Sequence, residues 1–267
     1  MCPQGLESFE MKKGNFDFEL YKRLAVEFKE RGVSSLKLSM RGEPLLHPQL
    51  ADMVSLAKEA GVLETMINTN GQLLGENKIR DLYEAGLDYL IISIDGASAK
   101  TYNSIRRGGD YDLLVENIEN ALAIRDKMKL RKPLIRLQYV LMPENEHEVD
   151  DYLHMWESKV DVITVNRYSN RGAGDKRLFP YTPIGRSNCY HPWRRLSVNW
   201  NGDAKMCCGD WEDRCVLGNL NDTSIYDIWH GETFNRYRSL LKKEDLDQIA
   251  CCKDCFVLAS YKWEKEK

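Results

Sequence analysis

Apolar residues follow two different periods over the first 167 residues of the chain. Stripes of apolar residues three or four positions apart predict helices over residues 18–30, 50–57, 76–85, 98–104, 113–128 and 149–159. Short apolar runs between these stripes predict buried strands over residues 35–39, 64–68, 89–94, 135–141 and 162–165. Glycine commonly ends a helix, and it lies between a predicted helix and the next strand at Gly32, Gly61 and Gly86.

The alternation of strands and helices indicates an α/β fold with a parallel sheet. Hairpin connections are too short to contain helices of this length, so we expect right-handed crossovers between the strands. A polar or glycine-containing turn follows each predicted strand, at residues 41–43, 68–71, 93–96, 142–145 and 166–167. Because the carboxyl ends of parallel strands meet at one edge, we expect these turns to line a single cleft.

The first of these turns, Gly42-Glu43-Pro44, is the strongest single candidate for a ligand site. It places an acidic side chain directly after a buried strand, between a glycine and a proline. Taken alone, the tripeptide is also typical of a tight turn with a solvated glutamate. The polar turns at the other strand ends favour ligand binding, because loops at this edge of α/β sheets carry the chemistry.

A second region begins near residue 187, after a turn-rich stretch that we interpret as a linker over residues 168–186. Alternating apolar residues flank Asn201-Gly202, which predicts a β-hairpin between residues 196–200 and 204–207. Seven of the eight cysteines of the chain also lie in this region. Composition therefore separates a cysteine-rich second domain from the α/β domain.

Composition and charge narrow the class of protein. The chain has 267 residues, of which 43% are hydrophobic and 30% are charged, which fits one large globular domain with an appendage. No apolar run approaches the length of about 20 residues that a spanning helix needs, and no signal peptide is recognisable, so we expect a cytoplasmic protein. The net charge is −3, and no basic run favours nucleic acid or a membrane as partner.

Four of the cysteines have the spacing of a metal site. Without an export signal, a disulfide framework is not expected, and cysteines then point to metal or redox chemistry. The hairpin cysteines and a later Cys-x-x-Cys pair complete a four-thiolate set made of Cys189, Cys207, Cys252 and Cys255. Such a set accepts either an iron–sulfur cluster or structural zinc, and spacing does not separate the two. A set of buried free thiols is the alternative.

The choice within two neighbouring pairs also stays open. Cys208 adjoins Cys207 and Cys251 adjoins Cys252, so either member of each pair is a possible ligand. Cys215 is surplus to the set.

Several motifs together resemble those of radical S-adenosylmethionine (SAM) enzymes with a C-terminal SPASM-type domain. Cys2-Pro3 resembles the last cysteine of the family's CxxxCxxC loop, and Gly42-Glu43-Pro44 resembles its Gly-Gly-Glu motif, with Arg41 in place of the first glycine. The cysteine pattern of the second domain is matched by Cys189, Gly202 and Cys207, which are separated by twelve and four residues. Further typical segments are residues 93–96, 101–102, 105–108, 218–220 and 228–229.

The resemblance implies a fold, cofactors and an activity. The fold would be a partial (β/α)6 TIM-like barrel over residues 1–167, lacking its first strand, followed by a small SPASM or twitch-type domain over residues 187–267. The cofactors would be SAM, a 4Fe-4S cluster that binds it, and one auxiliary iron–sulfur cluster. The enzyme would form a 5′-deoxyadenosyl radical and modify, by oxidation, a small-molecule or peptide substrate, with electrons from a donor such as a flavodoxin or ferredoxin.

The resemblance also assigns roles to individual residues. Glu43, with Gly42 and Pro44, would hold the methionyl amino group of SAM, and Arg106 would face its carboxylate. Asn70 and Ser93 would approach the ribose. Residues from Gln138 to Leu141 would line the adenine side. Cys2 would bind the SAM-associated cluster.

Two departures from the family pattern lead to further expectations. The first two cysteines of the cluster loop do not precede Cys2, so we expect the chain to be an inactive fragment of a longer protein. Tyr261 stands where the next cysteine of the SPASM pattern would fall, so we expect one auxiliary cluster. The competing interpretation is a truncated, non-catalytic scaffold that binds iron–sulfur or zinc.

Overall fold

The computed structural model describes residues 12–168, 183–186, 189–253, 255 and 259–261. The chain divides into two compact units, one from Tyr21 to Tyr168 and one that combines Met1–Leu20 with Ser169–Lys267. Cys2 and most of the predicted linker lie outside the described residues. We describe each unit by itself.

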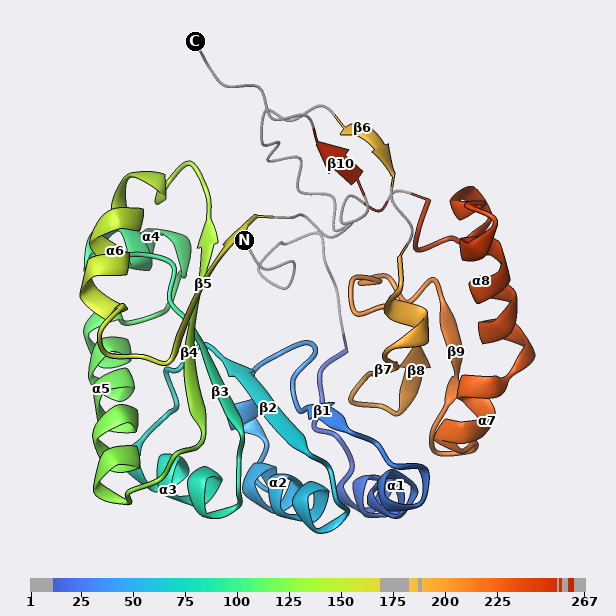
Figure 1. The fold of residues 1–267 in the computed structure, drawn as a ribbon, viewed down its shortest axis with the longest axis horizontal. Coiled ribbons are helices and arrows are strands. Elements are labelled where there is room, and N and C mark those ends of the chain that lie inside the picture. Colours follow the sequence, from blue (N-terminus) through green and yellow to red (C-terminus); the bar gives the residue numbers. More distant parts are fainter. Residues whose placement is uncertain (1–11, 169–182, 187–188, 254, 256–258, 262–267) are drawn as a thin grey trace. The chain divides into compact units, whose positions relative to one another are not determined.

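The first unit contains a parallel sheet with the strands in chain order (Figure 1). In the described part of this unit the order is β1-β2-β3-β4-β5. The strands are β1 (Ser35–Lys37), β2 (Glu64–Thr69), β3 (Tyr89–Ser93), β4 (Leu134–Leu141) and β5 (Val162–Arg167). The helices are α1 (Phe18–Arg31), α2 (Leu50–Glu59), α3 (Glu76–Glu84), α4 (Ala99–Ile105), α5 (Tyr111–Lys127) and α6 (Val149–Trp156). All five predicted strands are therefore confirmed, with small shifts at their ends.

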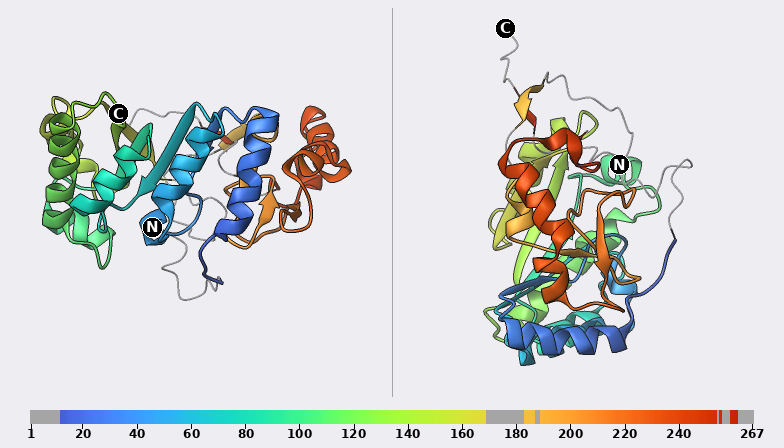
Figure 2. Two further views of the ribbon diagram at one scale, coloured as in Figure 1. Left: turned by 90° about the horizontal axis from the view of Figure 1, so that it is seen from below. Right: turned by 90° about the vertical axis from the view of Figure 1, so that its right-hand side faces the viewer.

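The helices cover one face of this sheet, because sequential right-handed crossovers all lie on the same side (Figures 1 and 2). Strand residues that face the helices are fully buried, among them Ile67, Ile92 and Leu137. Alternate residues of β2 and β4 are only partly buried, and they lie on the opposite face. Apolar side chains thus pack against the helices, and the other face carries polar residues such as Asn68, Arg136 and Gln138.

Strand β1 is shorter than the predicted range of residues 35–39. Leu38 N still donates a hydrogen bond to Met66 O. At residue 39 the acceptor is a side-chain oxygen instead of a backbone carbonyl. Ser39 Oγ accepts a hydrogen bond of 3.0 Å from Asn68 N. The ladder therefore ends where the sequence changes from strand to the turn that contains Glu43.

The second unit contains a three-stranded antiparallel sheet in its described part. Its strands are β7 (Ser197–Val198), β8 (Asp203–Lys205) and β9 (Val216–Asn219). The hairpin around Asn201-Gly202 is confirmed, since β7 and β8 pair across it. Gly202 has a φ of 88°, and a Cβ there would lie 2.7 Å from Asn221 Nδ2, so the turn needs glycine.

Two helices, α7 (Ile225–His230) and α8 (Glu232–Lys242), complete the core of the second unit. Phe234, Tyr237 and Leu241 of α8 pack with Met206 and Cys215. Outside this core, β6 (Pro183–Arg186) pairs with β10 (Ala259–Tyr261) within the second unit. Helices α7 and α8 and strand β9 were not predicted from the sequence.

No helix in the described ranges combines the length and apolar character needed to cross a membrane.

Candidate functional site

Glu43 connects the ends of two neighbouring strands. Its Oε1 accepts hydrogen bonds from Thr69 Oγ1 at 2.6 Å and from Leu45 N at 3.1 Å. Its Oε2 accepts one from Asn70 N at 2.8 Å. Pro44 begins the short helix η2 (Pro44–Leu46), and Glu43 caps it. Three donors hold the half-buried carboxylate, so it has a fixed position at the carboxyl end of β2 and retains one acceptor site for a further donor.

Polar side chains form a row on the face of the sheet that the helices leave free. Asn68 Nδ2 donates to Ser93 Oγ at 3.1 Å, and Lys37 Nζ donates to Asn68 Oδ1 at 3.5 Å. Ser93 is paired in register with Gln138, which is paired with Thr164. Side chains from β1 to β5 therefore meet on one surface, as expected for a binding face at strand ends.

Arg106 is held by a buried carboxylate at the end of β3. Its Nε donates to Asp95 Oδ2 at 2.6 Å, and the side chain of Asp95 is fully buried while that of Arg106 is 20% exposed. Asp95 Oδ1 also accepts from Val140 N at 2.7 Å. Nη1 and Nη2 of Arg106 have no partner among the described residues, so both are available to an anion such as a carboxylate.

Glu148 fixes the start of α4, the helix that carries the segment before Arg106. It accepts from Ser98 Oγ at 2.6 Å, from Thr101 Oγ1 at 2.7 Å and from Ala97 N at 2.7 Å. Burial alone would raise the pKa of this carboxyl, but the three hydrogen bonds outweigh it and lower the pKa below its ordinary value. Glu148 is therefore ionised over the neutral range.

The remaining predicted SAM contacts lie at the same strand ends. Asn70 Oδ1 accepts from Gln72 N at 2.9 Å, which closes the turn after β2. Gln138 and Leu141 lie on β4, at positions that are partly buried. Their expected contacts to the ribose and adenine remain predictions. Cys2 lies outside the described residues.

Arg136 is a candidate that the sequence reasoning missed. It lies on β4 next to Ile91 of β3, on the free face, and its Nε is buried with no hydrogen-bond partner. The sequence does contain a pattern that could have identified Arg136. Arg136 and Gln138 are the polar positions of an alternating strand whose apolar positions face the helices.

The four cysteines predicted as metal ligands interact with one another electrostatically in the second unit. Burial and the nearby thiols of Cys252 and Cys255 raise the pKa of Cys189. A hydrogen bond with Cys208, burial and the charge of Cys255 raise the pKa of Cys207. The four predicted ligands therefore lie near one another in the described part of the second unit, as ligands of a shared metal or cluster would.

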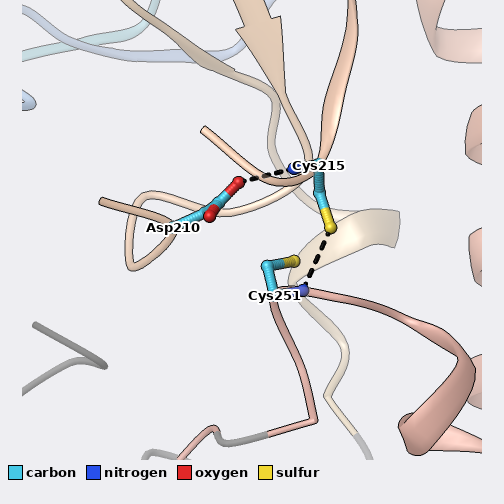
Figure 3. A group of neighbouring side chains, drawn as sticks. All are labelled: Asp210, Cys215 and Cys251. Atoms are coloured by element: carbon cyan, nitrogen blue, oxygen red, sulfur yellow. Dashed lines mark hydrogen bonds between the residues drawn. The ribbon is translucent and has the colours of Figure 1, made fainter. Parts of the chain in front are cut away.

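Cys251 contacts Cys215, which is not one of the four predicted ligands (Figure 3). Its backbone N donates to Cys215 Sγ at 3.2 Å, and a side-chain hydrogen bond between the two cysteines lowers the pKa of Cys215 to about 7. Asp210 Oδ2 accepts from Cys215 N at 2.8 Å. Asp210 Oδ1 also accepts from Arg214 N at 3.1 Å. The carboxylate of Asp210 thus shapes the loop before β9, and Cys251 lies against that loop.

A separate group of possible ligands lies close together in the second unit. Among the described residues, Asp210, Cys215 and Cys251 are the one group of three whose ligand atoms all lie within 4.8 Å of one another. Of these three, Cys251 was considered as a ligand in the sequence analysis, as the alternative to Cys252.

Two family models match the chain. That of the Radical SAM superfamily matches residues 1–155. That of SPASM, an iron–sulfur cluster-binding domain, matches residues 189–256. Together they cover both regions in which the sequence placed its candidate sites.

Curated relatives with different activities match the sequence. A GTP 3′,8-cyclase of Limosilactobacillus fermentum is 30% identical over 251 residues, which cover 91% of this chain and 69% of the cyclase. The S-adenosyl-L-methionine-dependent 2-deoxy-scyllo-inosamine dehydrogenase of Niallia circulans is 24% identical, with 95% of this chain and 85% of the dehydrogenase covered. An uncharacterized protein of Treponema pallidum is 27% identical, and the match covers 79% of this chain but only 60% of that protein.

Solved structures share the fold. The structure of BtrN in complex with AdoMet and 2-DOIA has a TM-score of 0.65 and 21% sequence identity, and the match covers 96% of this chain and 85% of BtrN. Streptococcus suis SuiB, bound to its precursor peptide SuiA, has a TM-score of 0.68 and 16% identity over 89% of this chain and 63% of SuiB. At these identities the likeness concerns the fold, and it confirms the predicted fold class.

Proposed function

The chain belongs to the radical SAM superfamily and carries a C-terminal SPASM domain, and from this premise we propose that it oxidises a small-molecule or peptide substrate. The family models thereby confirm the resemblance that the sequence motifs showed to radical SAM enzymes with a SPASM-type domain. The cofactors of these two domains are SAM and 4Fe-4S clusters. When bound, they supply a 5′-deoxyadenosyl radical, which abstracts hydrogen from the substrate, and an acceptor for the electron that an oxidation releases.

The arrangement of Glu43, Arg106 and Ser93 at the strand ends is the observation that carries this proposal. In our proposal the free acceptor site of Glu43 receives the methionyl amino group of SAM, with Gly42 and Pro44 shaping its turn. The free Nη groups of Arg106 hold the carboxylate. The remaining contacts follow along the same edge, with Asn70 and Ser93 at the ribose and Gln138 to Leu141 at the adenine.

For the auxiliary cluster we propose the four ligands Cys189, Cys207, Cys252 and Cys255. We favour Cys207 over Cys208 because Cys207, with four residues between it and Gly202, fits the SPASM spacing. The hydrogen bond from Cys251 N to Cys215 Sγ supports Cys252 over Cys251, because it ties residue 251 to the loop of Cys215. The neighbouring thiols then shape the site without binding iron.

The substrate class and the electron donor are part of the same proposal. The named relatives include a cyclase that acts on GTP and a dehydrogenase that acts on an aminocyclitol, so the family permits several chemistries. Oxidation is favoured because the dehydrogenase match extends over 95% of this chain and 85% of that enzyme. A flavodoxin or ferredoxin would supply the electron that starts each turnover.

The test is the release of 5′-deoxyadenosine. The full-length protein would be reconstituted anaerobically with iron and sulfide, reduced with dithionite or flavodoxin, and supplied with SAM. Liquid chromatography should then detect 5′-deoxyadenosine. Protein with loaded clusters that leaves SAM intact would instead favour the non-catalytic iron–sulfur or zinc-binding scaffold.

A further inference from the structure

A cavity of about 410 Å³ opens on the second unit, and none of its lining residues is a cysteine. It is formed by the short helix η4 (His191–Trp193), the end of α7, and α8. Its volume falls in the range of about 300–1,000 Å³ that is typical of small-molecule sites. The lining residues are Trp193, Trp229, His230, Asn235, Arg238, Ser239 and Lys242. None of them is acidic.

Arg238 carries a buried charge that no carboxylate neutralises in the described part of the chain. The residue is only 9% exposed. Its Nε donates to Pro192 O at 2.9 Å and its Nη1 donates to Trp229 O at 2.6 Å, so neutral acceptors hold it. Its Nη2 is buried with no hydrogen-bond partner. Burial of a charged group is costly unless it is paired, and here the pairing group is missing.

Aromatic rings hold the guanidinium in place. Its Cζ lies 3.9 Å from the ring centroid of Phe234 and 4.6 Å from that of Trp229. These contacts fix the charge at the wall of the cavity, since cations are attracted to the faces of aromatic rings. They do not neutralise it.

Lys242 lies one turn further along α8 and adds a second cation to the lining. It is exposed, and no acidic side chain in the described ranges pairs with it. On another wall of the cavity, Trp193 is 38% exposed, so part of its indole is accessible. The cavity thus combines two cations with an accessible flat apolar surface.

We propose that this cavity binds a small organic anion, whose charged group lies near Lys242 and Arg238 and whose planar ring stacks on Trp193. The positive lining selects an anion, and the indole selects a flat apolar body. The site requires neither SAM nor an iron–sulfur cluster, so it stands independently of the proposed reaction.

Calorimetry on the full chain tests the site with four probes. Benzoate carries a carboxylate on a planar ring, adenosine 5′-monophosphate carries a phosphate, and benzamide and adenosine are their uncharged counterparts. We expect one of the two anions to bind at least about tenfold more tightly than its uncharged counterpart, a difference of about 1.4 kcal/mol. Which anion binds identifies the charged group as carboxylate or phosphate.

Matched variants assign the binding to the cavity. Lys242→Gln and Trp193→Ala should each weaken binding by about tenfold, whereas Lys243→Gln, which lies beside the cavity lining, should leave it unchanged. Arg238→Gln should abolish binding in protein that retains its circular dichroism spectrum. If the Arg238→Gln variant unfolds, the affinity of the Lys242→Gln variant tests the proposal instead. Absence of binding by both anions, or equal affinities in the Lys242→Gln and Lys243→Gln variants, would overturn the proposal.

Discussion

The carboxylate of Glu43 and the hydroxyl of Thr69 form a hydrogen bond of 2.6 Å that joins the turn after β1 to the end of β2. The residue that the sequence singled out as a ligand contact is therefore also a structural link. Both roles follow from one geometry, because a carboxylate with three fixed donors presents its remaining lone pair in a defined direction. A substitution at Glu43 must be tested for both.

Glu43→Ala should lower stability and weaken SAM binding together. Removing the acceptor leaves Thr69 Oγ1 and Asn70 N without their partner, at a cost of about 1–3 kcal/mol in the free energy of unfolding. SAM affinity should fall by at least about tenfold, because the amino group loses its acceptor. Urea denaturation and calorimetry on reconstituted full-length protein measure the two effects.

The matched control is Glu76→Ala on α3. Glu76 is 63% exposed and pairs with Arg80 across one helical turn, so neither quantity should change appreciably. Equal SAM affinities in the two variants would remove Glu43 from the SAM site.

Arg106→Met should lower the free energy of unfolding, whereas Arg136→Met should not. The first leaves the fully buried Asp95 without its cation, which typically costs about 3–5 kcal/mol. The second replaces a side chain that has a buried, unpartnered Nε with an apolar one, so the free energy of unfolding should stay unchanged or rise. Urea denaturation of both variants provides the comparison. A large loss in Arg136→Met would mean that Arg136 has a structural partner in the protein.

Glu148→Gln should destabilise the protein in a pH-dependent way. The pKa of Glu148 is lowered in the folded state from its ordinary value of 4.5, so its ionised form contributes stability above pH 4.5. That contribution disappears as the pH falls through the lowered folded-state pKa. The difference in urea midpoint between the wild type and Glu148→Gln should therefore be constant near neutrality and shrink in acid.

The direction of that trend is the test. A difference that grew as the pH fell would show that Glu148 is stabilised in its protonated form, contrary to the three donors around it.

Serine substitutions should separate cluster ligands from their neighbours. Cys207→Ser and Cys252→Ser should each lower the iron content and the broad absorbance near about 400 nm, because each removes a proposed ligand. Cys208→Ser and Cys251→Ser should retain both signals. Iron analysis after anaerobic reconstitution measures this, with Cys215→Ser as a further control. Stoichiometric zinc in protein never exposed to air would instead identify a structural metal site.

Hydrophobic periodicity predicted the α/β unit well and the second unit only in part. The strands of the first unit alternate with helices along the chain, and each strand packs one face against those helices. Buried and partly buried residues therefore alternate along a strand, as they do in β4 from Leu134 to Val140. The helices α7 and α8 were missed because the sequence reasoning followed the cysteines and the hairpin there. The strand β9 has four residues, too few for a period to be recognised.

The candidate site shows a similar limit. Asp95 and Arg106 were both recognised as parts of motifs, but their ion pair depends on how α4 packs after β3, which no local pattern encodes. The choice between Cys251 and Cys252 also depends on a long-range contact, the one with Cys215. Spacing identifies which residue types are available, whereas tertiary packing decides which atoms meet.

The contact between Cys251 and Cys215 joins two segments that are 36 residues apart in the chain. Cys251 N donates to Cys215 Sγ, and Cys252 N donates to Ile249 O at 2.8 Å. These two hydrogen bonds order the backbone that presents the side chain of Cys252, and ordering it costs conformational entropy. Whatever Cys252 binds therefore meets a segment whose position is already restricted.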